Sequence, residues 1–103
     1  CFILEIIFDV IGDTLVAEMI GEIDHNQVVK GRERIDHALD NYSAVNLIFD
    51  FSKVTFMDSS GIGMITGRYK LVHPLGGKIY VCGVGENVER IITLSGLHKL
   101  VER

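Results

Sequence analysis

The fold is decided by residues 45–82, which read VNLIFDFSKVTFMDSSGIGMITGRYKLVHPLGGKIYVC. Val45–Phe51 is apolar apart from Asn46 and Asp50, a composition typical of a central parallel strand covered on both faces. Lys78–Cys82 is a second short apolar run and predicts another strand. Parallel strands need a long crossover between them, and the residues in between supply one.

The segment between these strands predicts a helix. Its apolar residues recur at intervals of three and four, as one buried helical face requires, at Ile62, Ile65, Tyr69 and Val72. Pro74 and Gly76-Gly77 then end the helix. The strand, the helix and the second strand form a βαβ unit, which is joined right-handed.

Two further strands are predicted before this unit. Phe2–Phe8 is rich in β-branched and aromatic residues, and Leu15–Ile20 is a second apolar run. Gly12-Asp13 marks a short turn between them. So short a connection predicts an antiparallel hairpin.

A helix start follows the hairpin. Asp24 is a good N-cap residue, and Gln27 stands three positions later, at the spacing of a capping box. Ile23 before the cap and Val28 after it suit a hydrophobic staple. The apolar positions of this helix then repeat on one face, at Val28, Ile35 and Leu39.

The C-terminal residues predict a third helix, whose inner face carries Val88, Ile91, Ile92 and Ser95. Gly96 is suited to end that helix, and a final turn is predicted at Leu97, Leu100 and Val101. The order ββαβαβα predicts one α/β domain over residues 1–103. We expect a four-stranded mixed sheet, with an N-terminal antiparallel hairpin, two βαβ crossovers and three to four helices.

Composition narrows the classes of function. The 103 residues include 10 Lys and Arg against 14 Asp and Glu, a formal charge of −4, whereas nucleic-acid binders present a basic face. No apolar run approaches the roughly 20 residues that span a bilayer, and no signal-peptide pattern opens the chain. We therefore expect a cytoplasmic protein that contacts neither nucleic acid nor membrane. Because the chain begins with Cys1, we expect residues to be missing at one or both ends.

Cysteine and histidine give no sign of a bridged or metal-bound structure. Cys1 and Cys82 are too few for a disulfide framework. Cys82 lies in an apolar run and is interpreted as a small buried hydrophobe. No metal-ligand spacing links the four histidines, which are His25, His37, His73 and His98. Neither a metal site nor a cofactor is expected.

The unusual segment is Phe56–Met64, which leaves a strand and enters a helix at two adjacent hydroxyls, Ser59 and Ser60. A helix N-terminus has free N–H groups and positive dipole character, so it stabilises an anion, and a phosphate especially. Either serine is also explained simply as a capping residue, which is the more common role at this position. Both interpretations stay open from the residues alone.

Three glycines at positions 61, 63 and 67 predict that the sheet, a partner or a ligand approaches this helix closely. Their spacing resembles a dinucleotide-binding fingerprint, but about nine residues separate the predicted strand from Gly61, whereas that motif follows its strand directly. No Gly-x-Ser-x-Gly nucleophile elbow occurs. An enzyme is therefore not expected, and a small nucleotide-binding or hydrolysing protein is the alternative from a different class.

Residues 56–63, continued by Gly67-Arg68-Tyr69-Lys70, resemble the signature of STAS-domain anti-sigma-factor antagonists. Three other segments agree with the same family in the same order, namely Gly21–His25, Gly76–Lys78 and Leu94–Leu97. The resemblance spans nearly the whole chain. It is greatest to the sporulation type of endospore-forming bacteria, and the general-stress type is the alternative within the family.

This resemblance implies a regulatory binding protein. In the family, an anti-sigma factor that is also a GHKL-type serine/threonine kinase phosphorylates the first serine after the aspartate, which is Ser59 here. The unphosphorylated antagonist binds the kinase–sigma complex and releases the sigma factor; the phosphorylated form does not bind, and a metal-dependent (PP2C-type) phosphatase restores it. The implied partner-binding surface around Ser59 comprises Asp24, Asp58, Ser60, Gly61 and Ile62.

Two features depart from the family pattern. Family members usually carry another amphipathic segment beyond the position of Arg103, so we expect the domain to be truncated at that helix. The sequence Gly31-Arg32-Glu33-Arg34 in the first helix does not match the family residue by residue. Both features leave the preferred partner open.

Overall fold

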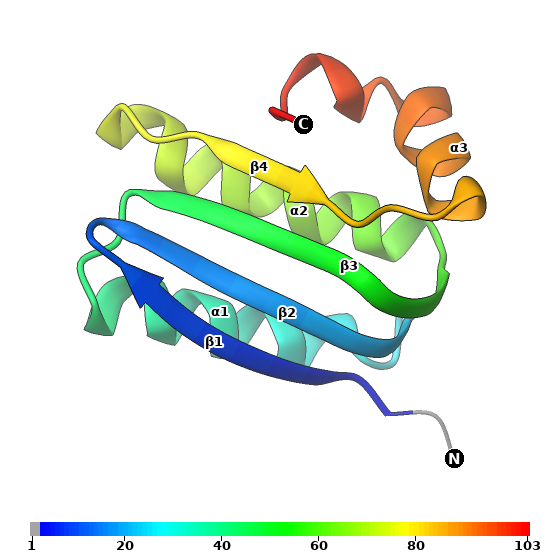
Figure 1. Ribbon diagram of the computed structural model, residues 1–103, viewed down its shortest axis with the longest axis horizontal. Helices are drawn as coiled ribbons and strands as arrows, with labels where there is room; N and C mark the ends of the chain where they lie inside the picture. Colours follow the sequence, from blue (N-terminus) through cyan, green and yellow to red (C-terminus); the bar gives the residue numbers. More distant parts are fainter. Residues whose placement is uncertain (1–2) are drawn as a thin grey trace.

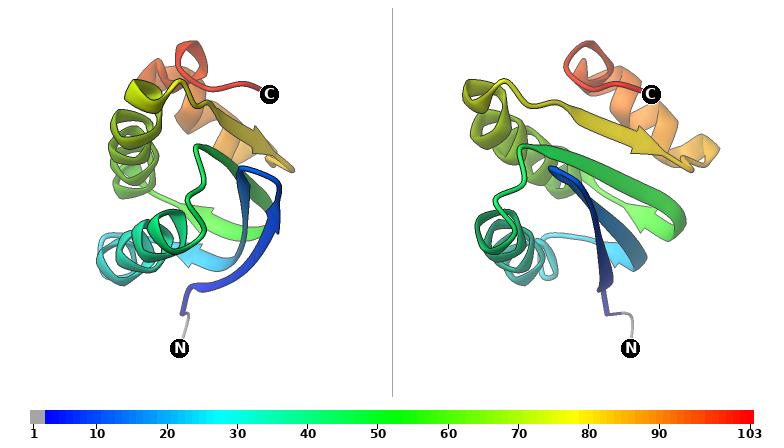
Figure 2. Two further views of the ribbon diagram at one scale, coloured as in Figure 1. Left: turned by 90° about the vertical axis from the view of Figure 1, so that its left-hand side faces the viewer. Right: turned by 60° about the vertical axis from the view of Figure 1, so that its left-hand side comes forward.

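The computed structural model describes residues 3–103 and contains one sheet of four strands, β1 (Glu5–Ile11), β2 (Thr14–Ile23), β3 (Asn46–Met57) and β4 (Ile79–Cys82), in that spatial order. β1 and β2 are antiparallel, and the other two pairs are parallel. Helices α1 (Val28–Asn41) and α2 (Ser59–Val72) connect the parallel strands and lie on one face of the sheet (Figure 1 and Figure 2). The predicted α/β class, hairpin and crossovers are confirmed.

The hairpin is shifted from its predicted position. β1 begins at Glu5 and continues to Ile11, whereas the sequence predicted Phe2–Phe8, and Phe2 lies outside the described residues. Ile11 pairs with Thr14, so only Gly12 and Asp13 form the turn. A two-residue turn fixes the register of both strands from this end, and Gly12 has the positive φ of 62° that such turns favour.

β3 is longer than the predicted Val45–Phe51. It pairs with β4 only as far as Asp50, yet it stays paired with β2 until Met57 lies opposite Ile23. Ser52 and Lys53 lie in this overhang with exposed side chains. Because they are polar, the apolar run from which the strand was predicted ends before them. A single residue separates β3 from α2, and Gly61 follows the end of β3 after only three residues, so the expected gap of about nine residues before Gly61 was wrong.

The core lies between the sheet and the two helices. Alternate residues of the central strands face the helices and are fully buried, namely Leu15, Ala17 and Met19 of β2 and Leu47, Phe49 and Phe51 of β3. The rings of Phe49 and Phe51 stack with centroids 5.5 Å apart. Ile35 of α1 and Ile65 of α2 close the core from the other side.

The opposite face of the sheet is covered by no helix in the part of the chain that the structure describes (Figure 2). Val16, Ile48 and Tyr80, which pair in one row across three strands, are only partly buried there. The prediction that β3 is covered on both faces was therefore wrong. Cys82 belongs to this face and is exposed, which corrects its interpretation as a buried hydrophobe. The slight loss of water around its thiol and the nearby Asp50 carboxylate both raise the pKa of Cys82.

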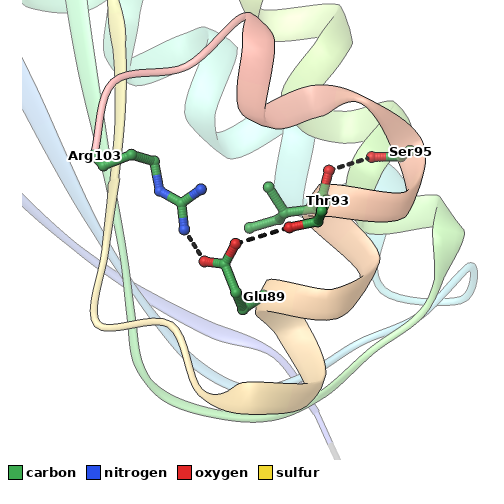
Figure 3. Close-up of polar contacts among 5 residues, drawn as sticks. Glu89, Thr93, Ser95 and Arg103 are labelled. Carbon is green, nitrogen blue, oxygen red and sulfur yellow. Dashed lines mark hydrogen bonds and ion pairs between the residues drawn. The ribbon is translucent and has the colours of Figure 1, made fainter.

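The C-terminal residues fasten α3 (Glu86–Ser95) to the edge of the sheet. Gly96 ends α3 with a φ of 80°, as predicted, and a 3-10 turn follows at Leu97–Lys99. The Glu102 N–H then donates to the Ile79 carbonyl at 2.7 Å, and Glu102 accepts from the Val81 N–H at 2.9 Å. Beside this pairing, the Glu89 carboxylate on α3 accepts from Arg103 and from the Thr93 hydroxyl (Figure 3).

The outer edge of β1 is partly covered by an α1 side chain. Arg34 donates from Nη2 to the Ile6 carbonyl at 3.0 Å, and its guanidinium lies 5.6 Å from the centroid of the Phe8 ring. The longest helices of the fold, α1 and α2, have 14 residues each. None of the helices in residues 3–103 combines the length and the hydropathy of a membrane span.

One ion pair joins α1 and α2. Arg68 is buried, and its Nε lies 2.9 Å from the Asp36 carboxylate, while Nη1 donates to the Met64 carbonyl at 3.1 Å. Burial lowers the pKa of Arg68, and the Asp36 carboxylate opposes that shift. A guanidinium nevertheless stays charged at any physiological pH, so Asp36 is needed to compensate a buried charge.

We expect Asp36→Asn to lower the free energy of unfolding by about 1–2 kcal/mol, because it leaves the Arg68 charge buried and uncompensated. The loss stays below that of a fully buried pair because the Asp36 side chain is itself 41% exposed. Arg32→Gln is the matched control. Arg32 lies on α1, as Asp36 does, but its positive charge repels Arg68, so its removal leaves stability unchanged or slightly higher. Urea denaturation measures both, and equal midpoints for Asp36→Asn and the parent chain would contradict this role.

Candidate functional site

The C-terminal ends of β2 and β3 place two aspartates at the same edge of the sheet. Ile23 and Met57 are the last paired residues, and the Asp58 N–H donates to the Ile23 carbonyl at 3.1 Å. Asp24 and Asp58 are the next residues along each strand. Both carboxylates therefore lie where the chain turns from the sheet into a helix, and Ser59 follows directly.

Asp58 is the residue that caps α2. Its Oδ1 accepts from the Ser60 N–H at 2.8 Å, and its carbonyl accepts from the Gly61 N–H at 3.0 Å. This corrects the interpretation of Ser59 or Ser60 as the cap. Ser59 occupies the first helical position with an exposed side chain, Ser60 is half-buried, and within residues 3–103 no hydrogen bond engages the Ser59 hydroxyl.

Asp24 is held by the turn that it starts. Its Oδ1 accepts from the Asn26 N–H at 3.0 Å and from the Gln27 N–H at 3.1 Å. The second half of the predicted capping box does not form, because the Gln27 side chain accepts instead from the Leu4 N–H at 3.2 Å. The helix itself begins later than predicted, at Val28. Asp24 thus has a fixed position at the edge that also carries Asp58.

Gly61 lets α2 lie directly on the strand ends. A Cβ at this position would be 2.5 Å from Met57 Cγ, closer than such carbon atoms approach, and 3.1 Å from Ile23 Cγ2, which is a tight contact. A Cβ at Gly63 or Gly67 would meet no atom within 4 Å. The glycine at position 61 therefore serves contact between helix and sheet, and its face is filled by protein side chains where a dinucleotide fingerprint would hold a pyrophosphate.

An apolar surface adjoins Ser59, and the sequence did not predict it. Leu94 is 79% exposed and Phe56 48% exposed, while Ile62 and Ile91 are half-buried. A shallow pocket of about 320 Å³ between α2 and α3 is lined by Ser59, Ile62, Ile91, Leu94 and Ser95. We call Phe56, Ser59, Ile62, Ile91 and Leu94 the Ser59 surface.

This surface was not predicted because the apolar periodicity of both helices assigned its residues to the core. Ile62 and Ile91 were predicted to belong to buried faces, but α2 buries Met64, Ile65 and Arg68 more deeply, and α3 buries Val88 and Ile92. Of the predicted core residues of α2, Ile65 and Val72 are buried as predicted, whereas Ile62 and Tyr69 are only half-buried. Leu94 could have indicated this surface from the sequence, because it is an apolar residue on the otherwise polar side of α3. In the described part of the chain, no three His, Cys, Asp or Glu side chains are arranged to hold a metal ion.

Comparison with known proteins places this arrangement in a family. Residues 5–103 match the family model described as STAS domain. The chain belongs to the STAS domain family. This STAS domain is 37% identical over 87 residues to an anti-sigma F factor antagonist of Paenibacillus polymyxa, an alignment that covers 84% of this chain and 74% of that relative. It is 28% identical over 85 residues to an anti-sigma-B factor antagonist of Listeria monocytogenes, covering 80% of this chain and 71% of the relative.

Solved structures agree with this assignment. The structure of the anti-sigma factor antagonist SpoIIAA in its unphosphorylated form has a TM-score of 0.80 and 30% identity, and the match covers 98% of this chain and 85% of that one. The phosphorylated form of the Bacillus protein SpoIIAA has a TM-score of 0.72 and 29% identity, covering 98% and 88%. The resemblance to STAS-domain antagonists of the sporulation type is confirmed, since the sigma F relative is more similar than the sigma-B relative.

We expect opposite effects from alanine at two neighbouring glycines of this STAS domain. Gly61→Ala forces α2 away from Met57 and Ile23 and lowers the free energy of unfolding by about 1–3 kcal/mol, as overpacking does. Gly63→Ala meets open space, and it raises that free energy by about 0.5–1 kcal/mol because alanine favours a helix. Thermal unfolding of both variants gives the comparison. If both alanines stabilised the domain equally, the close contact at Gly61 would not exist.

Proposed function

We propose that this STAS domain is an anti-sigma-factor antagonist whose binding is switched by phosphorylation of Ser59. The observation that carries the proposal is the Ser59 hydroxyl, which is exposed and unpaired at the start of α2 and adjoins an apolar surface. A kinase requires an accessible hydroxyl, and an exposed apolar patch is typical of a protein-binding site. The same face supplies both.

The proposed partner is an anti-sigma factor that is also a GHKL-type serine/threonine kinase, opposed by a metal-dependent (PP2C-type) phosphatase. The relatives named as anti-sigma factor antagonists support this partner class. The higher identity to the sigma F relative favours the sporulation pathway over general stress. Partners of these types act in the cytoplasm, so we place the domain there.

The proposed contact surface combines the implied family residues with the Ser59 surface. Ile62 belongs to both sets and lies one helical turn after Ser59 on α2. Asp24 and Asp58 form the acidic side, each held in place by backbone N–H groups. Ser60 and Gly61 contribute mainly through the position of the α2 backbone, because Ser60 is half-buried and Gly61 is buried.

A phosphate on Ser59 would oppose binding through charge and desolvation. It adds about −1.5 to −2 charges at neutral pH, next to Asp58 and on an apolar surface that the partner has to cover. Covering it removes water from a dianion, which costs several kcal/mol unless the partner supplies matching cations. A loss of only about 2.8 kcal/mol weakens binding about 100-fold.

The same phosphate would affect the fold only slightly. The N-terminus of α2 offers positive dipole character, which favours an anion by about 0.3–1 kcal/mol, and Asp58 repels it. Two opposing contributions of similar size leave the stability of the domain nearly unchanged. The switch therefore acts on association and not on folding.

A regulatory binding protein is the better proposal than an enzyme. The unpaired Ser59 hydroxyl has no histidine bonded to it as a base, so the structure provides no reason for nucleophilic reactivity within residues 3–103. A nucleotide-binding protein, the alternative class, loses its main support because Gly61 packs against Met57 and Ile23. Incubating the domain alone with labelled ATP and GTP distinguishes the two, since a switch protein gives no turnover.

We expect Ser59→Ala to bind the cognate anti-sigma kinase with wild-type affinity and to accept no phosphate from it. Ser59→Asp should bind about tenfold more weakly, because aspartate supplies one of the phosphate's charges. Ser60→Ala is the matched control and should still be phosphorylated on Ser59. Calorimetric titration and tandem mass spectrometry read these outcomes. Phosphate on Ser60, or equal affinity for all three variants, would contradict the proposal.

We also expect Leu94→Ser to weaken binding of the same kinase at least about tenfold, because it removes exposed apolar area from the Ser59 surface. Its effect on stability should be small, since the Leu94 side chain gains little burial on folding. Ile11→Ser, which removes another largely exposed apolar side chain at the far end of β1, is the control and should bind normally. Undiminished binding by Leu94→Ser would move the interface elsewhere.

A further inference from the structure

A second apolar groove lies at the other end of the helices, between the C-terminal parts of α1 and α2. It has a volume of about 570 Å³, and its apolar lining consists of Leu39, Ala44, Val45, Leu71, Val72 and Leu75. These two helix ends face the reader in the left-hand view of Figure 2. We call this feature the α1–α2 groove.

The walls of the α1–α2 groove are unusually exposed for apolar residues. Leu71 is 47% exposed and Leu75 63% exposed, whereas Leu39 and Val72 below them are buried in the core. These two leucines lie four residues apart above buried apolar side chains. Covering them with a partner would remove apolar surface from water, which favours binding. Concave apolar surfaces of this size bind ligands or the side chains of a partner.

The electrostatic environment of the groove is negative. Asp36 and Asp40, one turn apart on α1, both line it. Arg68 compensates Asp36, but Asp40 forms no ion pair with any residue that the structure describes. Both helices also end at this groove, and a helix C-terminus carries partial negative charge that attracts cations. The basic residues of this region, Lys70 and His73, do not line the groove.

We propose that the α1–α2 groove binds a cationic amphipathic segment of a partner protein, with its apolar side chains between Leu71, Leu75 and Leu39 and a Lys or Arg beside Asp40. The charges decide between occupants. A second copy of this domain would bring Asp40 and two helix C-termini against the same groups, and an anionic membrane would be repelled. An amphipathic segment with basic flanks satisfies both the apolar floor and the acidic wall.

This second surface is independent of the proposed switch. Ser59 begins α2 and the groove lies at its far end, so the two are about 20 Å apart along a helix of 14 residues. That separation exceeds the screening length of about 8 Å at physiological salt. A phosphate on Ser59 therefore leaves the groove unchanged, and the domain is able to hold this segment in either phosphorylation state.

The test uses a synthetic peptide of about 14 residues, roughly four helical turns, with leucines on one face and arginines flanking them. A second peptide with glutamates in place of the arginines is the matched probe. Titration followed by NMR amide shifts should give saturable binding of the arginine peptide with a dissociation constant below about 1 mM. The shifts should centre on residues 36–45 and 68–76. The affinity should fall with added salt, and it should be about tenfold lower for the glutamate peptide.

Two groove variants and two controls complete the experiment. Leu75→Ser and Asp40→Asn should each weaken the arginine peptide several-fold, whereas Leu94→Ser and Ser59→Asp at the other end should bind it unchanged. The proposal is overturned by shifts that centre on Ser59, by equal binding of both peptides, by the absence of saturable shifts, or by groove variants that convert a dimer to a monomer in light scattering. Because kinase binding is not measured, failure here leaves the proposed switch untouched.

Discussion

The site depends on the parallel pairing of β2 with β3, which persists until Ile23 lies opposite Met57. That last pair is extended by the Asp58 N–H, which donates to the Ile23 carbonyl and so fixes where the strand stops. Asp58 is then in position to cap α2, and the next residue is the first of the helix. Strand pairing thereby determines where the Ser59 hydroxyl stands.

The division of roles between Asp58 and Ser59 follows from this geometry. A serine that capped the helix would have its oxygen engaged by a backbone N–H. The aspartate performs the capping instead, so the serine hydroxyl stays unengaged. The absence of a Cβ at Gly61 keeps the start of the helix against the sheet, so the hydroxyl is presented from a rigid support.

The sequence predicted the fold better than the surface. Strand and helix order followed from apolar periodicity, because the core between sheet and helices demands it. The overhang of β3 was missed because Ser52 and Lys53 are polar, and only a structure reveals that β2 continues beside them. Cys82 was misjudged because its side chain alternates with the buried Val81 and so points to the open face of the sheet. The apolar Ser59 surface was missed because Ile62 and Ile91 look like core residues until the helices are oriented on the sheet.

The sheet has two edges, and each carries a contact that discourages the addition of another strand. At β4, Glu102 already occupies the backbone groups of Ile79 and Val81. At β1, the Arg34 side chain binds the Ile6 carbonyl and places a charge beside the edge. Proteins with unprotected edges risk polymerising through their backbones, which is slow to reverse. With both edges occupied, the domain can associate with other proteins only through its side chains, and such complexes dissociate without unpairing a sheet.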